Sequence, residues 1–227
     1  MGSSDAAKIL SIAKLLRSSY GHRKFDREMD PIGELIRTIL SQNTSDRNSV
    51  RAYDNLRRRF KNWNMLRYAR ISAIKREIKI AGLAKIKAPR IKGALDEIER
   101  RCGSLNLSFL GGLDVRLGYR FLKSIKGVGP KTAACVLLFS FRKPIMPVDT
   151  HIFRVTKRLG ILDKKSTHER AQEYFSEVVP KDLIYEFHIN IILHGRQVCI
   201  ARYPRCRICG LKRLCKYYEE RYGRQVP

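Results

Sequence analysis

Residues 121–155 read FLKSIKGVGPKTAACVLLFSFRKPIMPVDTHIFRV and predict two helices joined by a glycine turn, with a further helix start near the end. Gly127 and Gly129 flank Val128, and glycine lets a backbone turn sharply and approach another molecule closely. Pro130 follows at once, and proline suits the first position of a helix, where its missing N–H is not needed. A helix that starts after such a turn presents backbone N–H groups to an anion. The segment therefore predicts a phosphate site at the glycine turn.

The charge of the chain points to a polyanionic partner. There are 47 Lys and Arg residues against 21 Asp and Glu residues, a formal net charge of +26. Basic side chains on one face displace counterions from phosphates, so a nucleic acid explains this balance better than solubility does. A basic proteome with a solvated surface remains an alternative, and membrane-surface binding is less favoured because no basic amphipathic helix rich in Trp and Phe stands out.

Apolar residues recur at helical spacing along most of the chain, whereas alternation with a period of two is almost absent. We therefore expect an all-α fold. No apolar run is long enough to span a bilayer, and no signal-peptide core follows the N-terminus. We accordingly expect a cytoplasmic, nucleoid-associated protein. The expected helices are 5–19, from 31, from about 46, 65–69, 72–80, 88–101, from 114, from 130, 166–178 and 182–196, with a loop at 103–112.

Four of the six cysteines crowd near the C-terminal end with the spacing C-x6-C-x2-C-x5-C. They are Cys199, Cys206, Cys209 and Cys215. Four thiolates this close in sequence can wrap one compact metal centre. A zinc ribbon usually has two well-separated C-x2-C pairs, so an iron–sulfur cluster is favoured over zinc, with four free structural cysteines as the third reading. Cys102 and Cys135 fall on expected helices and are predicted to be buried apolar residues.

Two motifs together resemble a known family. The run LKSIKGVGPKTA is followed by VDTH, with 18 positions from Lys131 to Asp149, and this pattern is similar to the helix-hairpin-helix DNA glycosylases. The tail LHGRQVCIARYPRCRICGLKRLC looks like the iron–sulfur loop of the endonuclease III branch. The hairpin alone occurs in many DNA-binding proteins, whereas the three features in this order are highly specific. The resemblance covers most of the chain.

The resemblance implies a particular architecture. A six-helix barrel with the helix-hairpin-helix is expected at 24–143, and a second helical domain at 1–23 and 144–227 is expected to carry a [4Fe–4S] cluster on the four C-terminal cysteines. It also implies a DNA-binding cleft between the domains and a monomeric protein whose partner is double-stranded DNA with a damaged base or an abasic site.

The implied activity is removal of oxidised pyrimidines followed by strand cleavage at the abasic site. Lys131 matches the family's nucleophile and Asp149 its essential carboxylate. The chemistry suits both residues, because an amine can displace the base and form a Schiff base, and the positive end of a helix favours loss of the lysine proton. The non-catalytic alternatives are a phosphate contact for Lys131 and a helix N-cap for Asp149.

Base removal inside a duplex requires the base to leave the stack, so side chains must fill the gap. The position of Asn43 usually carries glutamine in the family, and Gln42 stands beside it, so either residue is a candidate. Leu83 matches a wedge at the opposite strand, although a core role is an equal alternative. Arg202 and Arg205, between the cysteines, are expected to contact backbone phosphates.

Three other functions compete with this interpretation. A mismatch-specific thymine or uracil glycosylase typically lacks the lysine found at 131. An adenine-removing relative would carry a glutamate in the helix before the polar loop, and Glu34 lies one turn too early. The third is a non-enzymatic DNA-binding module that uses hairpin and charge alone. His151, His194 and Trp63 are expected to have structural roles.

Overall fold

The computed structural model describes residues 3–25, 28–163 and 165–223. The regular structure of these described residues is helical throughout, without a strand, which confirms the predicted all-α fold. The chain divides into two compact units. One comprises Met1–Asp26 and Pro144–Pro227, and the other comprises Arg27–Lys143.

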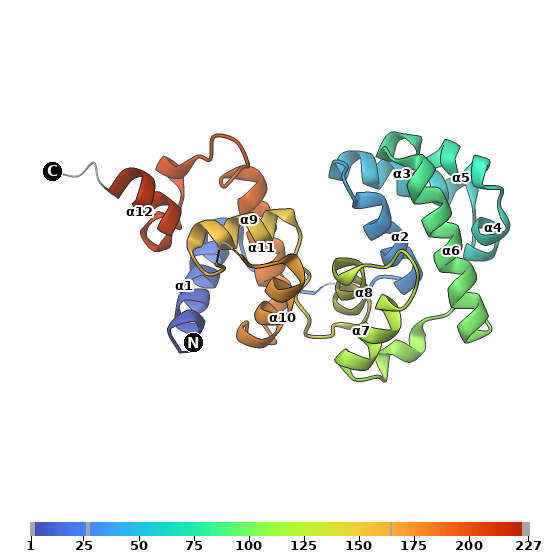
Figure 1. Cartoon of the computed structure of the whole chain (residues 1–227), viewed down its shortest axis with the longest axis horizontal. Helices are drawn as coiled ribbons and strands as arrows, with labels where there is room; N and C mark the ends of the chain where they lie inside the picture. The colour runs from blue at the N-terminus through green and yellow to red at the C-terminus, as the bar shows by residue number, and fades with distance from the viewer. Residues whose placement is uncertain (1–2, 26–27, 164, 224–227) are drawn as a thin grey trace. The chain divides into compact units, whose positions relative to one another are not determined.

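The unit formed by Arg27–Lys143 is built around the packing of α2 against α8 (Figure 1). α8 is buried along almost its whole length, and α2 buries Leu35, Ile36 and Ile39 completely. The hairpin and the polar turn after α2 are therefore both attached to the core of this unit. Its helices are α2 (Pro31–Ser41), α3 (Asp46–Arg59), α4 (Trp63–Tyr68), α5 (Ile71–Ile78), η1 (Lys79–Ala81), α6 (Ala84–Cys102), η2 (Ser108–Gly111), α7 (Val115–Lys123) and α8 (Pro130–Phe141).

Side-chain caps fix where several of these helices begin. The Oδ2 atom of Asp30 accepts a hydrogen bond from Gly33 N at 3.0 Å, directly before Pro31 at the first helical position of α2. Ser45, rather than Asp46, caps α3 by accepting from Asn48 N at 3.4 Å. Such caps satisfy backbone N–H groups that have no partner within the helix.

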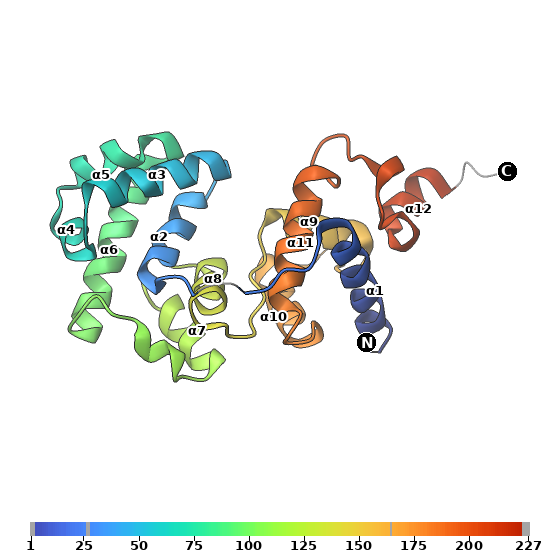
Figure 2. The same cartoon turned by 180° about the vertical axis from the view of Figure 1, so that it is seen from behind.

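The other unit is organised around α11, which packs against both α1 and α9 (Figure 2). The carboxylate of Glu186 on α11 accepts two hydrogen bonds from Arg17 on α1, at 2.6 and 3.0 Å, and also pairs with His22. This carboxylate ties the N-terminal helix to the C-terminal half of the chain. The helices are α1 (Ser3–Tyr20), α9 (Thr150–Leu159), α10 (His168–Val178), α11 (Ile184–Gln197), η3 (Cys206–Ile208), η4 (Lys212–Leu214) and α12 (Lys216–Tyr222).

Two details differ from the sequence-based expectations. The segment 103–112 is not entirely loop, because it contains η2. Cys135 is buried as predicted, but Cys102 is only half-buried, since it lies in the last turn of α6. Within the described part of the chain, no helix has the length and apolar character that crossing a membrane requires.

Candidate nucleic-acid interface and active site

The glycine turn between α7 and α8 contains two glycines, and their backbone conformations and surroundings differ. Gly127 has φ +90°, which residues with a side chain rarely adopt, and a Cβ atom there would lie 3.3 Å from Arg90 Cγ. Gly129 has an ordinary φ of −87°, and a Cβ atom there would meet nothing within 4 Å. The backbone conformation therefore explains why position 127 is a glycine, whereas the space around the Gly129 Cα atom is open. Val128, between them, points into the core and is 5% exposed.

The N-terminus of α8 lies directly behind this turn. Gly129 is its N-cap residue and Pro130 its first helical residue, and the described residues supply no side-chain cap to it. Uncapped N–H groups at a helix start, together with the helix dipole, form an anion site.

Lys131 lies half-buried in the first turn of α8. Its charge interacts with the carboxyl group of Glu34 on α2. Burial raises the pKa of Glu34 to about 7, although a hydrogen bond from Thr38 Oγ1 (3.2 Å) and the charges of Arg37 and Lys131 oppose the shift. The carboxyl group thus changes its charge near neutral pH within reach of the predicted nucleophile.

Asp149 is the N-cap of α9, and its Oδ1 atom accepts a hydrogen bond from Ile152 N at 2.8 Å. The cap uses one of the two carboxylate oxygens. His151 interacts with the Asp149 charge and contacts Arg154 through Nδ1 at 3.1 Å. His188 Nδ1 on α11 contacts the carbonyl oxygen of Pro147, two residues before Asp149, at 3.0 Å. The latter bond fixes the loop that leads to Asp149.

Two turns of the Arg27–Lys143 unit end in residues with left-handed backbone. Asn43 has φ 51° and is exposed, and Leu83 has φ 49° with 47% of its surface exposed. A left-handed leucine is unusual and marks a backbone held by its surroundings. Leu83 is therefore not a core residue. Gln42 differs from Asn43, because its Oε1 atom accepts a hydrogen bond from Arg90 Nη1 at 3.0 Å.

Lys87 on α6 is a further polar residue of this region, and it lies outside the motifs of the hairpin and the cysteine loop. It is 1% exposed, and its Nζ atom donates to the carbonyl oxygens of Leu40 (2.7 Å) and Ala81 (2.9 Å). Burial lowers the pKa of its ammonium group. A signal was present in the sequence, since Lys87, Ile91 and Leu95 recur every four residues and Lys87 therefore falls on the buried stripe.

The four C-terminal cysteines line one cavity of their unit, together with Arg158 and His194. Burial raises the pKa of Cys206, Cys215 and, to about 11, Cys209. A metal must therefore displace the thiol protons when it binds. Within the described ranges no three His, Cys, Asp or Glu side chains are grouped as ligands of a single metal ion. Four thiols around one cavity have the donor chemistry that an iron–sulfur cluster requires.

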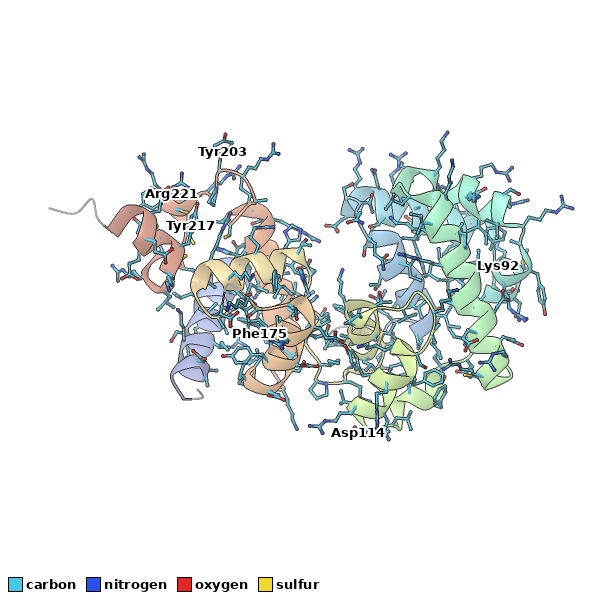
Figure 3. The ribbon with its side chains drawn as sticks, in the orientation of Figure 1. Lys92, Asp114, Phe175, Tyr203, Tyr217 and Arg221 are labelled. Atoms are coloured by element: carbon cyan, nitrogen blue, oxygen red, sulfur yellow. The ribbon has the colours of Figure 1, made fainter. Side chains whose placement is uncertain are left out.

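The surface of the cysteine loop is basic. Arg202 and Arg205 are exposed, and between them Tyr203 is 89% exposed, with φ 54°. Figure 3 shows Tyr203 pointing away from the helices of its unit. His194, by contrast, is buried, and its Nδ1 and Nε2 atoms lie 3.0 Å from Tyr20 Oη and 3.5 Å from Cys209 Sγ.

Comparison with known proteins places this geometry in a family. Residues 36–181 match the model of the HhH-GPD superfamily base excision DNA repair protein. Endonuclease III of Sulfolobus acidocaldarius is 35% identical over 186 residues, covering 81% of each chain, and that of Thermotoga maritima is 34% identical over 195 residues, covering 86% of this chain and 87% of the relative. A protein of Arabidopsis thaliana is 35% identical over 162 residues, and this chain spans 55% of its length.

Solved structures show the same fold. A trapped Endonuclease III–DNA covalent intermediate matches with a TM-score of 0.80 at 24% identity, covering 95% of this chain and 98% of the other. A thermostable thymine-DNA glycosylase matches with a TM-score of 0.79 at 22% identity, covering 96% of this chain and all of the other (100%).

The chain belongs to the HhH-GPD superfamily of base excision DNA repair enzymes. More narrowly, it is an Endonuclease III-like DNA glycosylase, which confirms the resemblance drawn from the hairpin and cysteine motifs.

Proposed function

We propose that this glycosylase removes oxidised pyrimidines from duplex DNA and then cleaves the strand at the abasic site. The observation that supports this most is the position of Lys131 in the first turn of α8, behind a glycine turn whose helix receives no side-chain cap from the described residues. The backbone N–H groups there would hold a phosphate of the damaged strand. The net charge of +26 favours a DNA partner, as does the likeness to a fold solved with DNA.

The proposed reaction begins with the neutral amine of Lys131. It attacks C1′ of the deoxyribose, and the bond from C1′ to the base breaks, so that the base leaves with the bonding electrons and takes up a proton. The sugar ring opens to a protonated Schiff base on the lysine. Loss of a C2′ proton then expels the 3′ phosphate by β-elimination, and water releases the lysine and the unsaturated aldehyde.

Asp149 would stabilise the positive charge that develops on the sugar as the bond to the base breaks. A carboxylate can hold this charge while one of its oxygens remains bonded to Ile152 N, so the capping role and the catalytic role are compatible. We propose that both residues act on the same nucleoside.

The gap left by the extruded base would be filled by Asn43 rather than Gln42. The reason is that the Gln42 amide oxygen is already bonded to Arg90, whereas Asn43 is exposed on a left-handed turn. Leu83, exposed on a similar turn, would enter at the opposite strand.

We propose that Cys199, Cys206, Cys209 and Cys215 hold a [4Fe–4S] cluster. The cluster would fix the shape of the surrounding loop, and Arg202 and Arg205 of that loop would contact DNA phosphates.

Borohydride trapping tests the lyase reaction. The intact protein should form a covalent adduct with duplex DNA that carries an abasic site, because borohydride reduces the Schiff base to a stable amine. Lys131→Gln should lose both the adduct and nicking while it still binds the DNA. Lys126→Gln, which removes an exposed lysine from the same turn, serves as the matched control and should still form the adduct.

Two results would reject the proposal. Equal nicking by Lys131→Gln would exclude Lys131 as the nucleophile, and an intact protein that binds abasic DNA without forming an adduct would be a glycosylase or binding module without lyase activity.

A further inference from the structure

One buried ammonium group joins two left-handed turns of the Arg27–Lys143 unit, those that end at Asn43 and at Leu83. Leu40 lies in the last turn of α2, three residues before Asn43, and Ala81 ends η1, two residues before Leu83. Lys87 Nζ donates to the carbonyl oxygens of both Leu40 and Ala81, at 2.7 and 2.9 Å. The last carbonyl groups of a helix have no partner within it, so an outside donor fixes how the chain leaves the helix.

An ammonium group is costly to bury, and Lys87 is 1% exposed. Its two carbonyl partners compensate this cost at the negative ends of two helical segments, where a cation is favoured. The same helix makes a second contact with the turn after α2, since Arg90, three residues along α6, donates to Gln42 Oε1. α6 thus holds this turn at both its main chain and its side chain.

We propose that Lys87 is a positioning residue, whose two bonds to main-chain carbonyls set the directions in which Asn43 and Leu83 project. This inference rests on the proposed entry of Asn43 and Leu83 into the duplex. Two side chains that enter opposite strands must keep a fixed separation, and one shared donor enforces it. Lys87 itself touches neither the DNA nor the reacting atoms in this scheme.

The chain offers a matched control on the same helix. Lys92 of α6, labelled in Figure 3, is half-buried and also donates to a main-chain carbonyl, that of Arg67 on α4. Lys87→Met and Lys92→Met each remove an ammonium group of α6 that donates to a main-chain carbonyl, but only the first affects the two turns.

The test compares two substrates. One is a duplex with a single oxidised pyrimidine, which must be extruded, and the other is a single-stranded oligonucleotide with a preformed abasic site, which has no base to extrude. Lys87→Met should lose about 100-fold in base removal from the duplex, as expected for a misplacement of about 1 Å, and keep its nicking of the single strand. Lys92→Met should match the unsubstituted protein on both substrates. Lys87→Gln keeps a hydrogen-bond donor, so its rate of base removal should lie between those of Lys87→Met and Lys92→Met. It also provides a test if Lys87→Met does not fold.

A second readout does not depend on catalysis. A duplex with 2-aminopurine opposite an abasic site becomes more fluorescent when that base is unstacked, so the intact protein should raise the signal and Lys87→Met should not, at equal occupancy. If Lys87→Met lost activity equally on both substrates, the positioning role would be overturned. The same holds if its fluorescence signal and its rate of base removal equalled those of Lys92→Met. If the intact protein nicks neither substrate but raises the fluorescence, the lyase proposal fails and the positioning of Asn43 and Leu83 stands.

Discussion

The guanidinium group of Arg158 donates a hydrogen bond to the Sγ atom of Cys199, with 3.3 Å between Nη1 and the sulfur. The same group donates to the carbonyl oxygens of Ile200 (2.7 Å) and Ala201 (2.9 Å). Arg158 also receives a contact from the loop, because the Sγ atom of Cys215 lies 3.3 Å from its carbonyl oxygen. One residue of α9 therefore holds both the first and the last of the four C-terminal cysteines.

Arg158→Met should lower the metal content of the purified protein, because the cysteine loop loses the guanidinium hydrogen bonds that reach Cys199, Ile200 and Ala201 from α9. Hydrogen bonds from a charged donor contribute about 1.5–3 kcal/mol each, so the loss is large compared with the stability of a short loop. Iron, acid-labile sulfide and zinc should be measured per chain, with Arg213→Met, an exposed arginine of the same loop, as the control. Equal iron in both variants would show that Arg158 does not support the site, and stoichiometric zinc without sulfide would refute the iron–sulfur proposal.

Asp149→Asn separates the catalytic and capping roles of this residue. Asparagine caps helices as well as aspartate does, so the melting temperature should be unchanged. Base removal should slow by about 10²- to 10⁴-fold, because the charge that stabilises the reacting sugar is lost. Asp114→Asn is the matched control, since Asp114 (labelled in Figure 3) caps α7 by accepting from Arg116 N at 2.8 Å. If both variants turn over at the rate of the unsubstituted protein, Asp149 is a helix cap and no more.

Local sequence signals predicted the elements that carry the site. Pro130 at the first position of α8 and aspartates before α2 and α7 mark helix starts because their preferences act within one helical turn. The helical period likewise gave the buried faces of α2 and α8 and hence the fold class.

Features that depend on contacts between distant segments were not predictable in this way. The left-handed conformation of Leu83 contradicts the backbone preference of leucine and requires tertiary restraint, whereas asparagine at 43 tolerates this region of φ. The helical period places Lys87 on the buried stripe of α6, but it does not identify the carbonyl groups that the ammonium group meets, one of which lies 47 residues away in sequence.

Glu34→Gln should change how stability depends on pH. The pKa of Glu34 is raised from 4.5 to about 7 in the folded protein, so as the pH rises between these values the unfolded chain loses the proton first and the folded state becomes less stable. At about pH 8 the glutamine variant should be more stable than the unsubstituted protein by about 3 kcal/mol, and at about pH 5 by less than about 1 kcal/mol. Melting temperatures at the two pH values measure this.

Glu97 provides a control of opposite sign for this experiment. Hydrogen bonds from Arg100 and Arg101 lower its pKa to about 2, so its contribution is complete at both pH values and is lost only in stronger acid. Glu97→Gln should therefore have the same effect at about pH 5 and about pH 8. A Glu34→Gln variant that behaves in the same pH-independent way would show that Glu34 is ionised throughout.

The two glycines of the hairpin should respond differently to alanine. Gly127→Ala should destabilise the fold by about 1–2 kcal/mol, because φ is +90° and the new Cβ would lie 3.3 Å from Arg90 Cγ. Gly129→Ala should leave the melting temperature unchanged or slightly raised, because its φ of −87° suits alanine and the site is open.

Gly129→Ala should nevertheless weaken DNA binding, because a phosphate that approaches the α8 N-terminus would meet the new methyl group. A loss of about tenfold in affinity, equivalent to about 1.4 kcal/mol, is expected in titrations with an abasic-site duplex. Gly93→Ala, at another position with nothing within 4 Å of the added Cβ, is the control and should bind normally. If Gly129→Ala binds as tightly as Gly93→Ala, the backbone of the glycine turn does not approach the phosphate, and the hairpin contributes to binding through its lysines alone.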